Sequence, residues 1–158
     1  MDNLQDPKLA ELLKTVDRSK FNNQSFSQKI PKPWGYEILW VPEDKPYMGK
    51  VMHIEAGKRL SLQLHDQKME TYFLMNGRAK LIWENAIGNL IETVMETGCG
   101  YSTEVGQQHR IQAIEDCDLM EVSLPETGTT YRLEDDYDRE HETEEMRKDP
   151  NRGWNSTD

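Results

Sequence analysis

Two glycine-bounded segments of the sequence carry side chains that could together bind a metal ion. The first segment contains Gln63, His65 and Glu70, and the second contains His109. Gln63 and His65 are two residues apart, so on a β-strand both would point to the same face. Imidazole, carboxylate and amide ligands suit a divalent first-row metal with open coordination positions. The sequence therefore predicts a metal site, in which the neutral Gln63 amide could either ligate or hydrogen-bond beside three other ligands.

The bulk composition limits the classes of partner. The 158 residues are enough for one domain with a hydrophobic core. The formal net charge of −10 argues against nucleic acid or an anionic membrane as a partner. No apolar run approaches the roughly 20 residues of a membrane-spanning helix, and the N-terminus lacks the pattern of a secretion signal. We therefore expect a cytoplasmic protein with a small-molecule substrate, in which Cys99 and Cys117 are free thiols.

Short segments with the composition of β-strands follow one another from Trp34 onward. Turn pairs such as Asn76–Gly77 separate them. Many short strands without intervening helices indicate an all-β sandwich or barrel. The expected strands are residues 36–41, 50–54, 61–65, 71–75, 79–83, 90–95, 110–113 and 119–123.

The two ends of the chain differ from this β-rich body. Residues 7–16 carry apolar side chains at helical spacing and begin with a proline, which favours a short amphipathic helix. The acid-rich end is expected to be solvated, with a helical turn or two over 141–148 and mobile last residues. We therefore divide the chain into an N-terminal helical extension (1–30), a barrel (31–139) and a charged C-terminal tail (140–158).

The two glycine-bounded segments resemble the paired motifs of the cupin superfamily. Three stretches are similar in particular to the cupin domain of type II phosphomannose isomerases, and the resemblance covers about residues 32–139. It implies a cupin double-stranded β-helix, or jelly-roll barrel, here with a short N-terminal helix and a polar C-terminal tail. The three stretches are KPWGYE at 32–37, GKRLSLQLH at 57–65 and YRLEDDY at 131–137.

The resemblance also implies a site and an activity. Its metal ligands would be Gln63, His65, Glu70 and His109, and zinc is favoured, with iron, manganese, cobalt and nickel also compatible. The implied enzyme interconverts an aldose phosphate and a ketose phosphate, first among them mannose 6-phosphate and fructose 6-phosphate. The reaction would pass through a metal-stabilised enediolate.

An isomerase of this kind also needs a group that moves a proton between carbons. The candidates are Glu104, which lies in the segment of His109, and Lys50 and His53, which precede the first segment. Each of the three has an alternative interpretation as an ordinary structural or solvent-facing residue.

A sugar phosphate further needs cationic and hydrogen-bonding side chains. Arg59, Arg132 and Arg139 could hold a phosphate through paired hydrogen bonds. Arg132 and Arg139 could equally well pair with the acidic run at 134–138. Tyr72 is two residues beyond Glu70 and could hydrogen-bond a substrate from the same strand face.

Two other functions remain open, because a fold does not fix a function. One is a metal-dependent cupin dioxygenase or lyase acting on a small organic acid, and the other is a non-catalytic cupin that binds a carbohydrate.

We also predict a homodimer, in which the apolar stripe of the N-terminal helix packs across the partner subunit. Alternatively, this helix covers the barrel of its own chain. The stripe consists of Leu9, Leu12, Leu13 and Val16.

Overall fold

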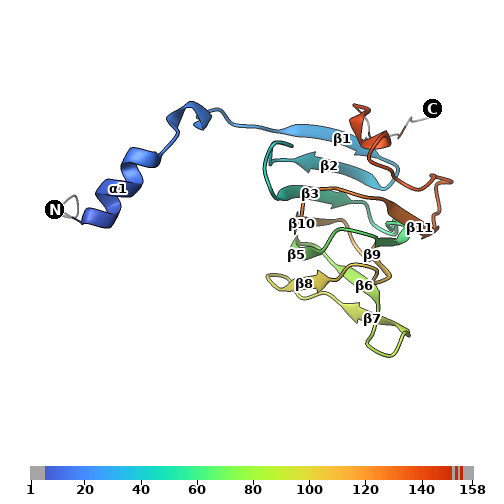
Figure 1. Cartoon of the computed structure of the whole chain (residues 1–158). Helices are drawn as coiled ribbons and strands as arrows, with labels where there is room; N and C mark the ends of the chain where they lie inside the picture. Colours follow the sequence, from blue (N-terminus) through green and yellow to red (C-terminus); the bar gives the residue numbers. More distant parts are fainter. Residues whose placement is uncertain (1–5, 151, 153, 155–158) are drawn as a thin grey trace.

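Two antiparallel sheets form a barrel in the computed structural model, which describes residues 6–150, 152 and 154 (Figure 1). Within this described part, one sheet has the strand order β1-β2-β3-β10-β5-β8 and the other the order β11-β4-β9-β6-β7. The strands are β1 (Gln28–Lys32), β2 (Gly35–Leu39), β3 (Met48–Ile54), β4 (Leu62–His65), β5 (Glu70–Asn76), β6 (Ala79–Glu84), β7 (Leu90–Val94), β8 (Gly100–Thr103), β9 (His109–Ala113), β10 (Cys117–Ser123) and β11 (Thr130–Glu134).

The inner face of the barrel changes from apolar to charged along a single strand. On β10, Cys117 and Leu119 are buried in the hydrophobic core, and Asp118 between them is less buried. This alternation is expected for a strand with one face in a core. The next inward position is Glu121, which is only 1% exposed. The core therefore gives way to buried charged side chains toward the end of β10.

The prediction of an all-β fold is confirmed, and each expected strand is present with its ends shifted by a few residues. Three strands were not predicted, namely β1, β8 and β11. β1 was missed because Pro31 argues against a strand in the sequence. Proline is tolerated mainly on edge strands, and β1 lies at the edge of its sheet. β8 and β11 were missed because turn glycines lie at one end of β8 and acidic residues lie at one end of β11.

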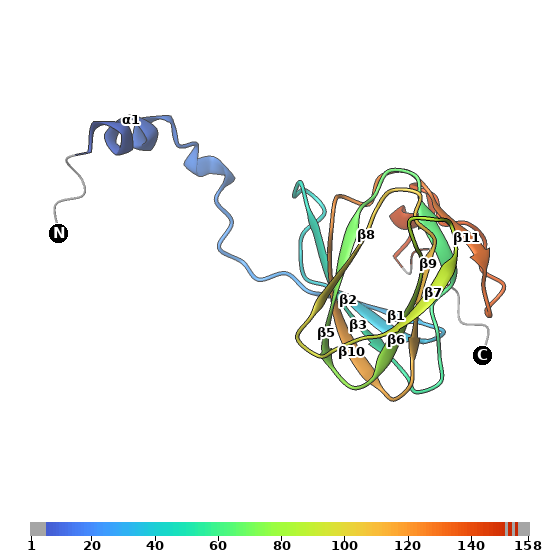
Figure 2. The same cartoon turned by 90° about the horizontal axis from the view of Figure 1, so that it is seen from below.

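The predicted N-terminal helix is α1 (Pro7–Thr15), and it projects away from the barrel (Figures 1 and 2). The Asp6 side chain accepts a hydrogen bond from the Lys8 backbone N–H and thereby caps the helix. No residue of α1 is buried, and Leu12 is 60% exposed. The alternative that the helix covers its own barrel therefore does not hold in this structure.

The residues that follow β11 return to the barrel, and we call residues 135–154 the C-terminal segment (Figure 1). Glu142 and Thr130 exchange both of their backbone hydrogen bonds, and the short 3-10 helix η3 (Met146–Lys148) follows. The expectation of a solvated tail is wrong for Glu142, Arg147 and Arg152. The Glu142 carboxylate forms buried ion pairs with both arginines. The last residues were predicted to be mobile, and most of these positions lie outside the residues that the structure describes.

No helix in the described part of the chain has the length and apolar character needed to cross a membrane.

Candidate functional site

A cluster of two histidines and one glutamate lies between the two sheets. His65 is the last residue of β4, His109 is the first of β9, and Glu70 is the first of β5 in the opposite sheet. Glu70 Oε1 lies 3.1 Å from His65 Nε2 and 2.7 Å from His109 Nε2. Each residue offers one ligand atom, and these atoms lie within 4.8 Å of one another. The fold thus brings together three residues that the sequence predicted as ligands.

The hydrogen bonds of His109 test whether these residues fit a metal ion. Its Nδ1 lies 2.8 Å from the carbonyl oxygen of Gln107, which can only accept, so Nδ1 carries the proton. Nε2 faces the Glu70 carboxylate and has no hydrogen-bond partner among the described residues. A cation between these two buried groups, either a proton on Nε2 or a metal ion, would satisfy both. The cluster fits a divalent metal, with a backbone carbonyl that orients the histidine.

Glu70 is held in its ionised form. Burial would raise the pKa of Glu70, but the Lys68 ammonium and both histidines outweigh burial and hold this pKa well below its usual range. Lys68 Nζ lies 2.7 Å from Glu70 Oε2. The Tyr72 hydroxyl donates to Glu70 Oε1, so both side chains lie on one strand face, and the hydrogen bond from Tyr72 to a substrate stays a prediction. Burial and the Glu70 charge raise the pKa of Tyr72 well above its usual value, so this hydroxyl remains a donor.

Gln63 lies beside the cluster on the neighbouring strands. Its Cα pairs with that of His109, and its side chain lines the same cavity as His65. The amide oxygen accepts a hydrogen bond of 2.8 Å from Ser61 Oγ. Both interpretations of Gln63 therefore stay open, and its role as a ligand stays a prediction.

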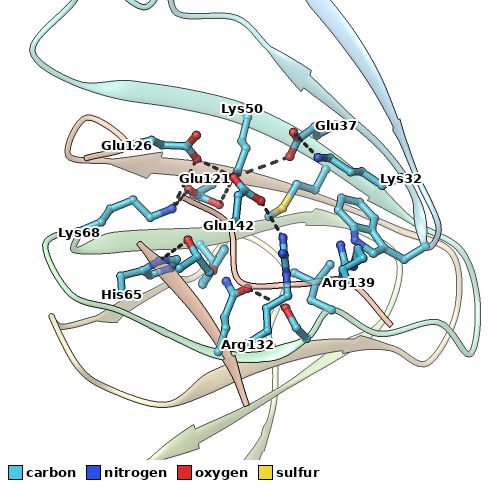
Figure 3. Close-up of a pocket in the computed structure, with 17 residues that line it drawn as sticks. Lys32, Glu37, Lys50, His65, Lys68, Glu121, Glu126, Arg132, Arg139 and Glu142 are labelled. Carbon is cyan, nitrogen blue, oxygen red and sulfur yellow. Dashed lines mark hydrogen bonds and ion pairs between the residues drawn. The ribbon is translucent and has the colours of Figure 1, made fainter. Parts of the chain in front are cut away.

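A cavity of about 50 Å³ extends from His65 toward a set of charged side chains (Figure 3). Lys50 Nζ lies 3.2 Å from Glu121 and 3.8 Å from Glu37, and Lys68 Nζ lies 3.2 Å from Glu121. Lys50, Glu121 and Tyr72 are in register across β3, β10 and β5. Two ammonium groups and two carboxylates thus lie together in the cavity, and Lys50 and Glu121 reach it from neighbouring strands.

Among the three predicted proton-transfer residues, only Lys50 lines this cavity. Burial would lower the pKa of Lys50, but Glu121 and Glu37 outweigh it and raise the pKa, so Lys50 is an ammonium and not a base. His53 points to the other face of β3, where it stacks on Tyr36 with ring centroids 4.9 Å apart. Glu104 is exposed and does not line the cavity.

The predicted substrate-binding arginines also separate into two groups. Arg132 and Arg139 line the cavity, whereas Arg59 pairs with Asp136 outside it. The alternative of ion pairing holds at the same time, because Arg139 pairs with Asp135 and Arg132 pairs with Glu142. Lining the cavity and forming an ion pair are therefore compatible.

Sequence reasoning missed most of the other charged residues of the cavity. Glu121 could have been found, because it occupies an inward position in the alternation that starts at Cys117 and Leu119. No local pattern indicates Glu142, since its burial depends on the return of the C-terminal segment. The missed residues that line the cavity include Lys32, Glu37, Lys68, Glu121, Glu126 and Glu142.

The two-sheet barrel with its internal His-Glu-His cluster defines this protein as a cupin. Oxalate decarboxylase from Bacillus subtilis, in a mutant form, has a TM-score of 0.62 and 19% identity over 72% of this chain and 33% of its own. A formate complex of oxalate decarboxylase from Lactobacillus farciminis has a TM-score of 0.62 and 22% identity over 72% of this chain and 37% of its own. At these identities the likeness shows the fold, and the chain spans about a third of the length of these structures.

The family model described as mannose-6-phosphate isomerase C-terminal matches residues 19–142, and the chain belongs to this family. No curated protein matched the sequence.

Proposed function

We propose that this protein is a metal-dependent isomerase that interconverts an aldose phosphate and a ketose phosphate. Mannose 6-phosphate and fructose 6-phosphate are the first pair to test, because the chain belongs to the mannose-6-phosphate isomerase C-terminal family. The observation that most supports the proposal is the content of one cavity. It has the metal cluster residue His65 at one end and the cations Lys32, Arg132 and Arg139 among its other lining residues.

The metal would be held by His65, Glu70 and His109, with Gln63 as a possible fourth ligand. Zinc is our first choice, and iron, manganese, cobalt and nickel suit the same donors. A bound divalent ion would supply the Lewis acidity that polarises the oxygens of the substrate.

Glu121 is the best-placed carboxylate for the proton transfer that isomerisation requires. It lines the cavity and lies 3.2 Å from both Lys50 and Lys68. A positioned base of this kind contributes about 10²- to 10⁴-fold to a rate. The ion pairs with Lys50 and Lys68 would hold the Glu121 carboxylate in position.

The cations matter because the whole chain repels anions. With a net charge of −10, the far field disfavours a phosphorylated substrate, so capture depends on local positive charge. Arg132 and Arg139 are the predicted residues that lie where such a charge is needed.

The test is turnover of mannose 6-phosphate to fructose 6-phosphate by protein that has been stripped of metal and reloaded separately with each candidate ion. We expect turnover that depends on the metal and is absent in His65→Ala. Stoichiometric metal binding without turnover by any loaded form would reject the isomerase.

A second function is supported by the size of the cavity. In this structure its volume is about 50 Å³, because ion pairs fill much of the space beside the cluster. A small organic acid needs less space than a sugar phosphate, and two of the similar solved structures are oxalate decarboxylases. Metal-dependent consumption of oxalate, with no turnover of sugar phosphates, would favour this decarboxylase or oxygenase alternative.

A homodimer in the cytoplasm completes the proposal. The exposed stripe on α1 supports the dimer, because α1 buries none of its residues in its own chain. Sedimentation equilibrium of the full chain and of a Leu12→Glu variant would test it. Dimer mass in the full chain and monomer mass in the variant is the expected result, and a monomeric full chain would reject the dimer.

A further inference from the structure

We infer that the anionic group of the substrate binds in a second cavity, between the barrel mouth and the C-terminal segment. Its volume is about 230 Å³. Its cationic lining residues are Lys32, Arg132, Arg139 and Arg152. The inference rests on the proposed function, and it assigns the phosphate of a sugar phosphate to this subsite.

The second cavity adjoins the first one. Lys32, Arg132 and Arg139 line both of them, so these three side chains form a shared wall. The first cavity also reaches His65 of the metal cluster. A ligand with two functional ends can therefore place its hydroxyl and carbonyl oxygens toward the cluster and its phosphate beyond the wall. A substrate such as oxalate has no such distal group.

Two of the four cations keep a hydrogen-bond donor free inside the protein. The Arg132 side chain is 8% exposed and the Arg152 side chain is 6% exposed. Each has a buried Nε–H without a hydrogen-bond partner among the described residues. Leaving a buried charged donor unsatisfied costs free energy, which a bound anion would recover. These unsatisfied donors belong to two side chains that line the cavity, and a small rotation of either guanidinium group would turn its Nε–H toward a bound anion.

Existing ion pairs fix the positions of the guanidinium groups. Arg132 Nη2 lies 2.7 Å from Glu142, and Arg152 Nη2 lies 2.8 Å from the same carboxylate. Asp135 pairs with Arg139 through Nε and Nη2. Arg152 also pairs with Glu37 and Glu126, but an arginine has five N–H donors, and the Nε–H of Arg152 remains without a partner among the described residues. Guanidinium groups held in advance lose less side-chain entropy when they bind a phosphate.

The lining of this cavity carries more cationic than anionic side chains, although the chain is acidic. The four cations compare with two carboxylates in the lining, Asp138 and Glu140, and both of these are exposed. Behind the lining, each of the four cations is also paired with Glu37, Asp135 or Glu142. An anion would therefore be held by N–H donors of these cations and not by an excess of positive charge.

Arg152 lies outside the region that matches the family model. The family match ends at residue 142, whereas Arg152, Met146 and Trp154 line the cavity from beyond that point. We infer that the C-terminal segment completes the phosphate subsite, so that phosphate affinity depends on residues outside the matched region.

The test uses the full chain and inorganic phosphate as the probe, with binding followed by isothermal titration calorimetry. The variants are Arg139→Gln and Arg152→Gln, with Arg152→Lys as a version that keeps the charge if the Gln variant does not fold. Arg59→Gln is the matched control, because Arg59 pairs with an aspartate and lines neither cavity. A hydrogen bond to a charged group contributes about 1.5–3 kcal/mol, which corresponds to roughly tenfold to a hundredfold weaker binding in each site variant.

Unchanged phosphate affinity in the site variants, with thermal unfolding intact, would overturn the inference. Weakening in Arg139→Gln but not in Arg152→Gln would overturn the contribution of Arg152, which lies beyond the family match. This test is independent of the proposed isomerase activity, because calorimetry measures phosphate binding without turnover. A protein that binds phosphate in this cavity but does not convert mannose 6-phosphate would reject the isomerase and keep the subsite. If the isomerase is active, Arg139→Gln should raise KM for mannose 6-phosphate more than it lowers kcat, and Arg59→Gln should change neither.

Discussion

The metal cluster and the ion network occupy neighbouring parts of one cavity but are built on different principles. The cluster places His65 and His109 against Glu70, and His109 Nε2 faces the Glu70 carboxylate, where a bound cation would satisfy both groups. In the network, each buried carboxylate already has a cationic neighbour, as Glu121 has Lys50 and Lys68. The cluster is thus incomplete without a ligand, whereas the network balances its own charge. We expect substitutions in the cluster to affect binding first and substitutions in the network to affect stability as well.

Removal of a cluster histidine should have the largest effect. In His109→Ala we expect metal affinity to fall by more than about 100-fold, since loss of an outer hydrogen-bond partner of a ligand already costs about 10- to 100-fold. Metal content after dialysis, measured by atomic emission, checks this. His53→Ala is the matched control, because His53 lies on the outer face of β3. Equal metal content in both variants would show that the cluster is not the metal site.

Glu121→Gln separates chemistry from metal binding. We expect kcat for the isomerase to fall by about 10²- to 10⁴-fold, because the neutral amide cannot accept a proton. Metal content should stay at the wild-type level, since Glu121 contacts Lys50 and Lys68 and not the histidines. A kcat within a few fold of the wild type would remove Glu121 from the proton transfer.

Glu142→Gln should destabilise the fold through the C-terminal segment. The substitution removes the negative partner of Arg132, Arg147 and Arg152. Loss of one partner from a buried ion pair costs about 3–5 kcal/mol in the free energy of unfolding. Urea denaturation measures it.

Glu145→Gln is the control for this variant, because Glu145 forms an exposed pair with Lys148 and such pairs contribute little. If the two variants unfold at the same urea concentration, the buried pairs of the C-terminal segment do not stabilise the fold.

The Glu142 carboxylate should also make the stability of the fold depend on pH in the acid range. Burial would raise the pKa of Glu142, but Lys32 and Arg132 outweigh it and hold the pKa below its ordinary value of 4.5. A pKa lowered by folding stabilises the folded state above the unfolded-state pKa, and this contribution is lost as the pH falls through the folded-state value. We expect the melting temperature of the wild type to fall as the pH is lowered from about 4.5, and to fall less steeply in Glu142→Gln. Parallel curves for both proteins would contradict this assignment.

The two cysteines give the smallest and simplest contrast. Cys99 is exposed, whereas burial raises the pKa of Cys117 to about 12. A thiol reagent acts on the thiolate, so at pH 8 we expect one fast-reacting thiol in the folded chain and two after denaturation. Absence of the fast phase in Cys99→Ser would confirm the assignment, and a persistent fast phase would show that Cys117 is accessible.

Local patterns were sufficient where neighbours along the chain decide the structure. The spacing of Gln63 and His65 placed both on one strand, and the turn at Asn76–Gly77 separated β5 from β6 as expected. Patterns failed where a choice depended on distant residues. His53 and Lys50 both looked like candidates, and only the packing of β3 against β2 and β10 turned Lys50 inward and His53 outward.

The sequence by itself determined most of the strands, the family resemblance and the three metal-cluster residues, because periodicity, turn chemistry and motif spacing are local properties. The tertiary structure alone decided which charges share a cavity. Glu37, Glu121, Glu142 and Arg152 lie far apart along the chain and meet only after the sheets pair and the C-terminal segment returns to the barrel mouth. The energy of a charge depends on its surroundings, and burial creates those surroundings only when the chain has folded.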